Sequence, residues 1–136
     1  MTTINQARRA VYDEFNDNYS PPYTPTVIFG NEAEDTEGLN EWLLLKLMNT
    51  DSEQHTLGKV GNRRYRRRGL VFIRIYTIVD DGLRRFDELA RAARDIYEGK
   101  TVSGVWFTDG IIREIGPIDD KYVGTVSINC SWDETK

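Results

Sequence analysis

The stretch Leu70–Val79, LVFIRIYTIV, decides the fold of this 136-residue chain. Successive side chains of a strand point to opposite faces of the sheet, and here both sets are largely apolar. One set is Val71, Ile73, Ile75 and Val79, and the other is Leu70, Phe72, Arg74, Tyr76 and Ile78. We therefore expect a strand that lies centrally in a sheet, or whose second face is covered by a helix or another subunit.

Upstream of this strand, the sequence predicts one helix and two further strands. From about residue 3 to 16, apolar side chains recur at helical spacing, and Thr2 or Thr3 can cap the first free amides. Prolines end that helix, and a strand follows at Thr26–Phe29. Residues Glu41–Met48 favour helix by propensity, but their length and flanking residues favour a strand, which we predict. The apolar helix positions are Ile4, Ala7, Val11 and Phe15.

Between the second and third strands, residues 50–68 are polar and contain the arginines. They form either a mobile loop or the extended tip of a hairpin. After a turn at Asp80-Asp81-Gly82, a second helix is predicted that ends before Gly99. Its apolar stripe is Leu83, Phe86, Ala90, Ala93 and Tyr97, and its polar face is Arg84, Arg85, Glu88, Arg91 and Asp95.

The last third of the chain predicts an antiparallel meander. Its strands lie near Val102–Phe107, Ile111–Ile118 and Tyr122–Trp132, with turns at Asp109-Gly110 and Asp119-Asp120. The expected fold is therefore α+β, a single domain over residues 1–136. A mostly antiparallel sheet carries an N-terminal helix and a central helix packed on it, and ends in the C-terminal β-meander.

Composition limits the compartment and the chemistry. No apolar run reaches the roughly 20 residues needed to cross a bilayer, and none near the N-terminus has signal-peptide length, so we expect no membrane partner. Cys130 is the single cysteine, which excludes an intramolecular disulfide and fits a reducing cytoplasm. It falls on the expected inward face of the last strand, where it packs as a small apolar residue.

The sequence gives no pattern typical of catalysis. His55, the single histidine, lies in a polar segment without a nucleophile motif beside it. The acidic residues lack the spacing of a calcium loop, and the glycines lack the ending of a phosphate loop. We therefore predict no catalytic residue, no cofactor and no metal, and no enzymatic activity.

Five arginines within residues 63–68 are the feature that needs a functional explanation. They contribute +5 in six positions, whereas the whole chain has a net charge of −4, so the remainder carries −9. Three interpretations remain open: a solvated loop, a protein interface, or contact with nucleic acid through arginine forks and the stacking ring of Tyr65. The acidic residues elsewhere would repel a polyanion outside the cluster.

The interface interpretation has a partner within the chain itself. The acidic segment around residues 32–37 could meet the arginines of an adjacent copy, and such head-to-tail contacts close into rings. Exposed ion pairs contribute only about 0–1 kcal/mol each, so apolar surface must supply much of the assembly energy. The candidate interface residues are Arg63, Arg64, Arg66, Arg67, Arg68, Glu32, Glu34, Asp35, Glu37, Phe72, Tyr76 and Trp132.

The segment GNRRYRRRG at residues 61–69, with Leu70–Tyr76, Gly82 and Leu89-Ala90, resembles the tail-terminator family of long-tailed bacteriophages. The order and length of the predicted elements resemble that family as well. The turn after the central strand departs from its pattern, because Asp80-Asp81 stands where a proline or small residues are expected.

The resemblance implies a structural role in the virion tail, after assembly in the host cytoplasm. Subunits of that family form a six-fold ring on the tail tube, stop tail growth and offer a docking surface to the head. The implied partners are other copies of the chain, the tail-tube protein and a head-completion or connector protein, with DNA passing through the lumen. The alternative is a small nucleic-acid-binding module that uses the cluster Arg63–Arg68.

Overall fold

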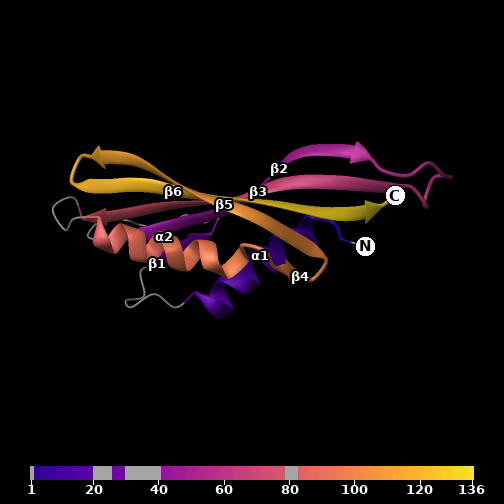
Figure 1. The fold of residues 1–136 in the computed structure, drawn as a ribbon. Helices are drawn as coiled ribbons and strands as arrows, with labels where there is room; N and C mark the ends of the chain where they lie inside the picture. Colours follow the sequence, from indigo (N-terminus) through magenta and orange to yellow (C-terminus); the bar gives the residue numbers. More distant parts are fainter. Residues whose placement is uncertain (1, 20–25, 30–40, 79–82) are drawn as a thin grey trace.

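The computed structural model describes residues 2–19, 26–29, 41–78 and 83–136. Figure 1 shows the two helices together below a long, twisted sheet. The predicted acidic segment and the turn at Asp80-Asp81-Gly82 lie outside the described residues. The elements in chain order are α1 (Ile4–Asn18), β1 (Thr26–Phe29), β2 (Trp42–Gln54), β3 (Arg64–Ile78), α2 (Arg84–Tyr97), β4 (Thr101–Val102), β5 (Val105–Ile118) and β6 (Lys121–Thr135).

The strands form one six-stranded sheet in the order β1-β2-β3-β6-β5-β4. All neighbours pair antiparallel except β1 and β2, which are parallel. The α+β class, the N-terminal helix, the second helix packed on the sheet and the C-terminal strands are confirmed. Within the segment Glu41–Met48, the residues from Trp42 onward lie in a strand, as predicted, and Glu41 lies just before it.

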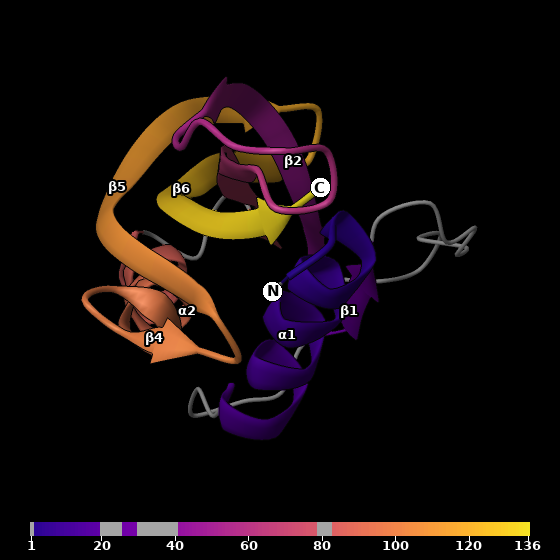
Figure 2. The same ribbon diagram turned by 90° about the vertical axis from the view of Figure 1, so that its right-hand side faces the viewer.

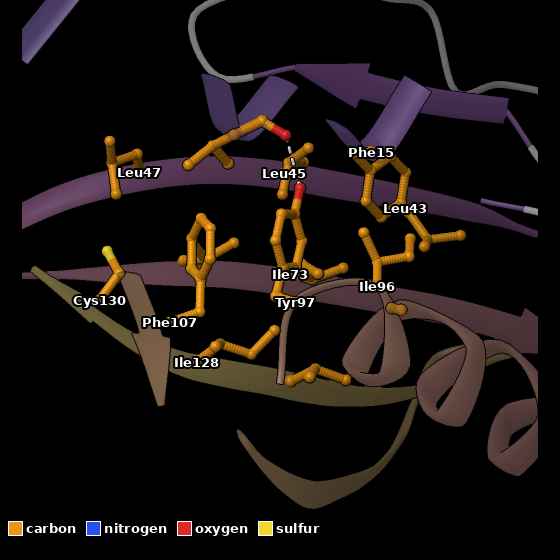
Figure 3. Packing of buried hydrophobic residues seen from close by; sticks show 14 of the residues in the cluster. Phe15, Leu43, Leu45, Leu47, Ile73, Ile96, Tyr97, Phe107, Ile128 and Cys130 are labelled. Atoms are coloured by element: carbon orange, nitrogen blue, oxygen red, sulfur yellow. Dashed lines mark hydrogen bonds between the residues drawn. The ribbon is translucent and has the colours of Figure 1, made fainter. Parts of the chain in front are cut away.

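The core lies between one face of this sheet and the two helices, over which the sheet curves (Figure 2). Val71, Ile73 and Ile75 of β3 are fully buried on this face, which we call the helix face. From α2, the ring of Tyr97 reaches through the core, and its hydroxyl donates a 2.6 Å hydrogen bond to the Val11 carbonyl of α1 (Figure 3). This bond ties the helices to each other inside apolar surroundings, which raise the pKa of Tyr97.

Helix α1 begins as the sequence predicts. Thr3 is the N-cap, and it forms a capping box with Gln6 in which each side chain accepts a hydrogen bond from the other residue's backbone amide. Ala7, Val11 and Phe15 of the predicted apolar stripe are buried. The helix continues to Asn18, two residues beyond its expected end at Asn16.

The predicted hairpin turn at Asp109-Gly110 is wrong, because β5 runs without a break from Val105 to Ile118. The pairing of β5 with β6 shifts register between Phe107 and Gly110, so the two residues before Gly110 form a bulge. The actual turn between β4 and β5 is Ser103-Gly104, where both φ angles are positive, at 50° and 84°. The turn at Asp119-Asp120 is confirmed, because Ile118 pairs directly with Lys121.

Arg85 does not lie on a solvated face of α2, contrary to the helical-wheel prediction. Its side chain is only 8% exposed, and its guanidinium forms a forked ion pair with Glu41, just before β2. The fork needs the bidentate geometry that arginine offers to a carboxylate. It fixes the start of α2 against the start of β2.

We predict that Gly124→Ala destabilises the fold by about 1–3 kcal/mol because it overpacks the core. Gly124 of β6 faces α2, and an added Cβ would lie 2.1 Å from Cζ of Phe86 and 2.9 Å from the Arg113 carbonyl oxygen. Urea denaturation measures the change. The control is Gly58→Ala, where the nearest atom to the added Cβ is at an ordinary 3.6 Å and little change is expected. Equal stabilities of the two variants would contradict the packing described.

Candidate interaction surfaces: the arm and the open sheet face

The polar segment at residues 50–68 forms the extended end of the β2–β3 hairpin, which was one of the two predicted alternatives. Beyond a register shift between Asn49 and Asp51, the two strands remain paired out to Gln54 and Tyr65. The last residues of β6 pair with β3 on its other edge. We call residues 49–68 together with 131–136 the arm, which projects past the helices in Figure 1.

Ion pairs across the three strands hold the arm together. The guanidinium of Arg66 donates two hydrogen bonds to Asp133 of β6, at 2.8 and 3.3 Å. Arg67 pairs with Glu134 at 3.0 Å. On the other edge, Arg68 reaches two carboxylates of β2, Asp51 at 2.8 Å and Glu53 at 2.9 Å. Arg66, Arg67 and Arg68 therefore bind carboxylates of their own chain.

Aromatic rings complete the packing of these guanidinium groups. Arg66 lies 4.8 Å from the ring centroid of Trp106, and Arg67 lies 5.0 Å from that of Tyr65. The ring of Tyr65, which could have stacked on a base, is thus partly covered by its neighbour. The arm contains seven basic and four acidic residues, so its net charge is +3 rather than the +5 of the cluster alone.

The tip of the arm, residues 55–63, has an ordered backbone but leaves apolar side chains free. The His55 amide donates to the Arg64 carbonyl at 2.7 Å, and the Arg63 side chain donates to the Gly58 carbonyl at 2.9 Å. Leu57 is 94% exposed and Val60 is 82% exposed. These two side chains point away from their own chain, where they gain nothing from the hydrophobic effect.

The second apolar surface is the sheet face opposite the helices, which we call the open face. Strand registers place on it the second set of the central strand, together with its neighbours on β2, β5 and β6. Among the described residues, no helix packs against this face. Its apolar members are Trp42, Leu44, Met48, Leu70, Phe72, Tyr76, Ile78, Trp106, Ile111 and Ile118, with Val123 fully buried among them.

Several side chains on the open face contact each other across strands. The rings of Trp42 and Tyr76 stack at a centroid distance of 4.5 Å. Lys46 lies 5.4 Å from the ring centroid of Phe72. Within the described part of the chain, the Nε of Arg74 is buried and has no hydrogen-bond partner, whereas Nη1 of the same guanidinium donates to Tyr76 Oη at 3.5 Å. A buried donor without a partner costs free energy, which an acceptor from outside could recover.

The structure brings together some of the predicted site residues and separates others. Phe72 and Tyr76 lie half-buried on the open face, away from the arm's tip. Trp132 cannot serve as an exposed contact, because its side chain is 1% exposed in the core beside Gly69. This corrects the prediction, and the reason is that Trp132 occupies the helix face of β6. Glu32, Glu34, Asp35 and Glu37 lie outside the described residues.

His55 and Cys130, the two residues considered for a catalytic role, lie in different parts of the fold. His55 begins the tip of the arm and is exposed. Cys130 is buried on the helix face, and burial raises the pKa of its thiol to about 12. Over residues 2–19, 26–29, 41–78 and 83–136, no group of three or more His, Cys, Asp or Glu side chains could hold a metal ion. No helix in these segments is long and apolar enough to span a membrane.

Sequence reasoning missed the carboxylate partners of the arginines. Asp51 and Glu53 precede their partner Arg68 by 17 and 15 residues, and Asp133 and Glu134 lie near the end of the chain. The available signal was the alternation of acidic residues in the polar half of β2, at the spacing of one strand face. The exposed pair Leu57 and Val60 was also overlooked among polar neighbours.

Comparison with known proteins shows the fold alone. No family model and no curated protein matches the chain. A solved structure that carries no functional description matches it with a TM-score of 0.71 and 15% sequence identity, over 97% of this chain and 96% of the other. The match extends over nearly the whole length of both chains, so the arrangement of helices and strands occurs elsewhere as a unit.

We predict that Asp133→Asn weakens the arm and removes part of the acid sensitivity of the fold. The Arg66 guanidinium holds the pKa of Asp133 below its usual range. The carboxylate therefore stabilises the fold above pH 4, and this stabilisation is lost as the pH falls through the lowered pKa. We expect a loss of about 1–2 kcal/mol at neutral pH, measured by urea denaturation across pH.

Asp120→Asn is the matched control, because that carboxylate lies in a turn with its side chain 84% exposed. It should change neither the stability nor its pH dependence appreciably. If Asp133→Asn kept the same fall in stability toward acid as the unchanged protein, the pairing with Arg66 would not be a source of that fall.

Proposed function

We propose that the protein is a structural subunit that acts by self-assembly into a ring, and that the ring closes the end of a phage tail tube. The observation that carries the assembly proposal is the distribution of exposed apolar side chains. Of seven large hydrophobic residues exposed in the described segments, Ile78, Ile111 and Ile118 lie on the open face, and Leu57 and Val60 on the tip.

The open face supports this proposal because its composition is typical of an interface. On this face, large aromatic and aliphatic residues lie beside Lys46, Arg74 and Arg113. The residues of Trp42–Met48 and of Leu70–Ile78 that belong to the open face include no acidic residue. A patch of this kind on a monomer would be a liability for aggregation unless it is covered. Aromatic residues and arginine are also the residue types enriched where interfaces are strongest.

The proposed position of the ring at the end of the phage tail tube rests on the sequence resemblance. It implies six copies, with the tail-tube protein on one side of the ring and a head-completion or connector protein on the other. Under this proposal DNA passes through the lumen without sequence-specific contact. The protein acts in the virion tail after assembly in the host cytoplasm.

The nucleic-acid module remains the competing class. The in-chain ion pairs weigh against it, because Arg66, Arg67 and Arg68 would have to release carboxylates before binding phosphates. An oligonucleotide that binds the monomer with a steep dependence on salt would favour this class over assembly.

The test is the absolute mass in solution, by light scattering after size exclusion, over a range of protein and salt concentrations. We expect a defined oligomer, with six times 15.7 kDa as the mass of the proposed ring. The double variant Ile111→Asp with Ile118→Asp should shift the protein toward the monomer, because it places two charges in the apolar contact. Both positions are exposed, so the subunit itself should fold.

Leu83→Asp is the matched control, because Leu83 is 44% exposed at the start of α2 and does not belong to the open face. It should leave the mass unchanged. A monomer at every concentration, with or without tail-tube protein added as a template, would contradict the proposed assembly. An oligomer unaffected by the open-face variant would place the interface elsewhere.

A further inference from the structure

We propose that the tip of the arm of one copy docks into a groove between α1 and the β4–β5 turn of a second copy. This inference rests on the proposed function, because it names the contact through which neighbouring subunits recognise each other. Two different surfaces of the same chain meet in such a contact, which makes it heterologous and allows a ring to close.

The groove has a volume of about 640 Å³. One wall is the exposed side of α1, and the other is the turn between β4 and β5, where Gly104 lies beside the Thr2 side chain. Figure 2 shows this turn next to α1. Three carboxylates line it, Asp13, Glu14 and Asp17, against one cation, Arg9. Among the described residues, none of these three carboxylates takes part in an ion pair closer than 4.0 Å, in contrast to the carboxylates of the arm. Ala10 and Val102 give the groove an apolar part.

The tip has the complementary properties. It carries Lys59, which has no carboxylate partner in the described segments, and the whole arm, tip included, has a net charge of +3. Leu57 and Val60 stand out from it almost fully exposed. The groove of one copy, with its unpaired carboxylates and apolar part, is therefore complementary to the tip of a second copy, which carries cationic and apolar side chains.

The arm is built so that its tip reaches another molecule. From Asn49 to Gln54 the hairpin extends for about 17 Å at the rise of a β-strand. It projects beyond the helices, so the tip does not contact the groove of its own chain (Figure 1). The ion pairs of Arg66, Arg67 and Arg68 stiffen this extension. A preorganised tip loses less conformational entropy on binding than a mobile loop would.

The first experiment uses charge reversal on the full chain, read as the protein concentration at half-assembly in light scattering. Lys59→Glu reverses a charge on the tip, and Asp13→Lys with Asp17→Lys reverses two charges in the groove. We expect each reversal alone to raise that concentration by about tenfold or more, which corresponds to about 1.4 kcal/mol. The chain that carries all three changes should regain most of the lost assembly, because opposite charges face each other again.

Lys100→Glu is the matched control, since Lys100 is exposed and belongs to neither surface. It should not change the concentration at half-assembly. Restoration by the combined variant cannot come from a merely unstable fold, because the combined chain holds every change present in the single variants.

The second experiment locates the contact by disulfide trapping between two variants, one with Val60→Cys and the other with Asp17→Cys. The native Cys130 does not interfere, because it is buried. Mixing the two and oxidising them should give a covalent dimer of one copy of each. Intact oligomers that show neither this dimer nor the charge rescue would overturn the docking proposal and leave the proposed assembly standing. A wild-type chain that is monomeric throughout would overturn both.

Discussion

The structure depends on the pairing of β3 along both of its edges. All fifteen of its residues pair with β6, and its partners on β2 extend from Trp42 to Gln54. A strand hydrogen-bonded on both sides over this length holds its neighbours in one register, because a slip of one residue would turn every apolar side chain of β3 to the wrong face. The helix face, the open face and the arm are consequences of this one register, since each consists of a defined subset of positions on β3 and the strands beside it.

Much of the fold was predictable because it follows local periodicity. The apolar alternation of Leu70–Ile78 and the helical spacing of Ile4, Ala7, Val11 and Phe15 identify their elements without tertiary information. The prediction of a hairpin turn at Asp109-Gly110 was wrong because Asp-Gly is also compatible with a bulge, and here β5 continues along β6 past that point. The prediction that Arg85 lies on the solvated face of its helix was wrong for a different reason. A helical wheel places charges on the solvated side, and only the ion pair with Glu41, far away in sequence, makes the burial of Arg85 favourable.

The candidate surfaces were less predictable, since they depend on long-range pairing. A run of five arginines suggests a free cationic patch when only the neighbours in sequence are considered. The sheet brings Asp51 and Glu53 to one edge of the run and Asp133 and Glu134 to the other, so that four carboxylates meet the guanidinium groups. The arginines are then part of the scaffold that makes the arm stiff. The exposed functional candidates on the arm include the uncharged Leu57 and Val60, which no charge pattern would have indicated.

The open face and the arm lie at opposite ends of the same strand, and this arrangement constrains how copies can associate. Residues Phe72 to Ile78 of β3 carry the apolar patch, whereas Arg64 to Arg68 carry the base of the arm. In the proposed assembly, one rotation between neighbouring copies must satisfy both contacts, because both surfaces are carried by the same strand. A single repeated rotation is the condition for a closed ring or a regular helix of subunits. Under the proposed assembly, the stiffness that the ion pairs give to the arm would serve the geometry of the ring, as well as the stability of the subunit.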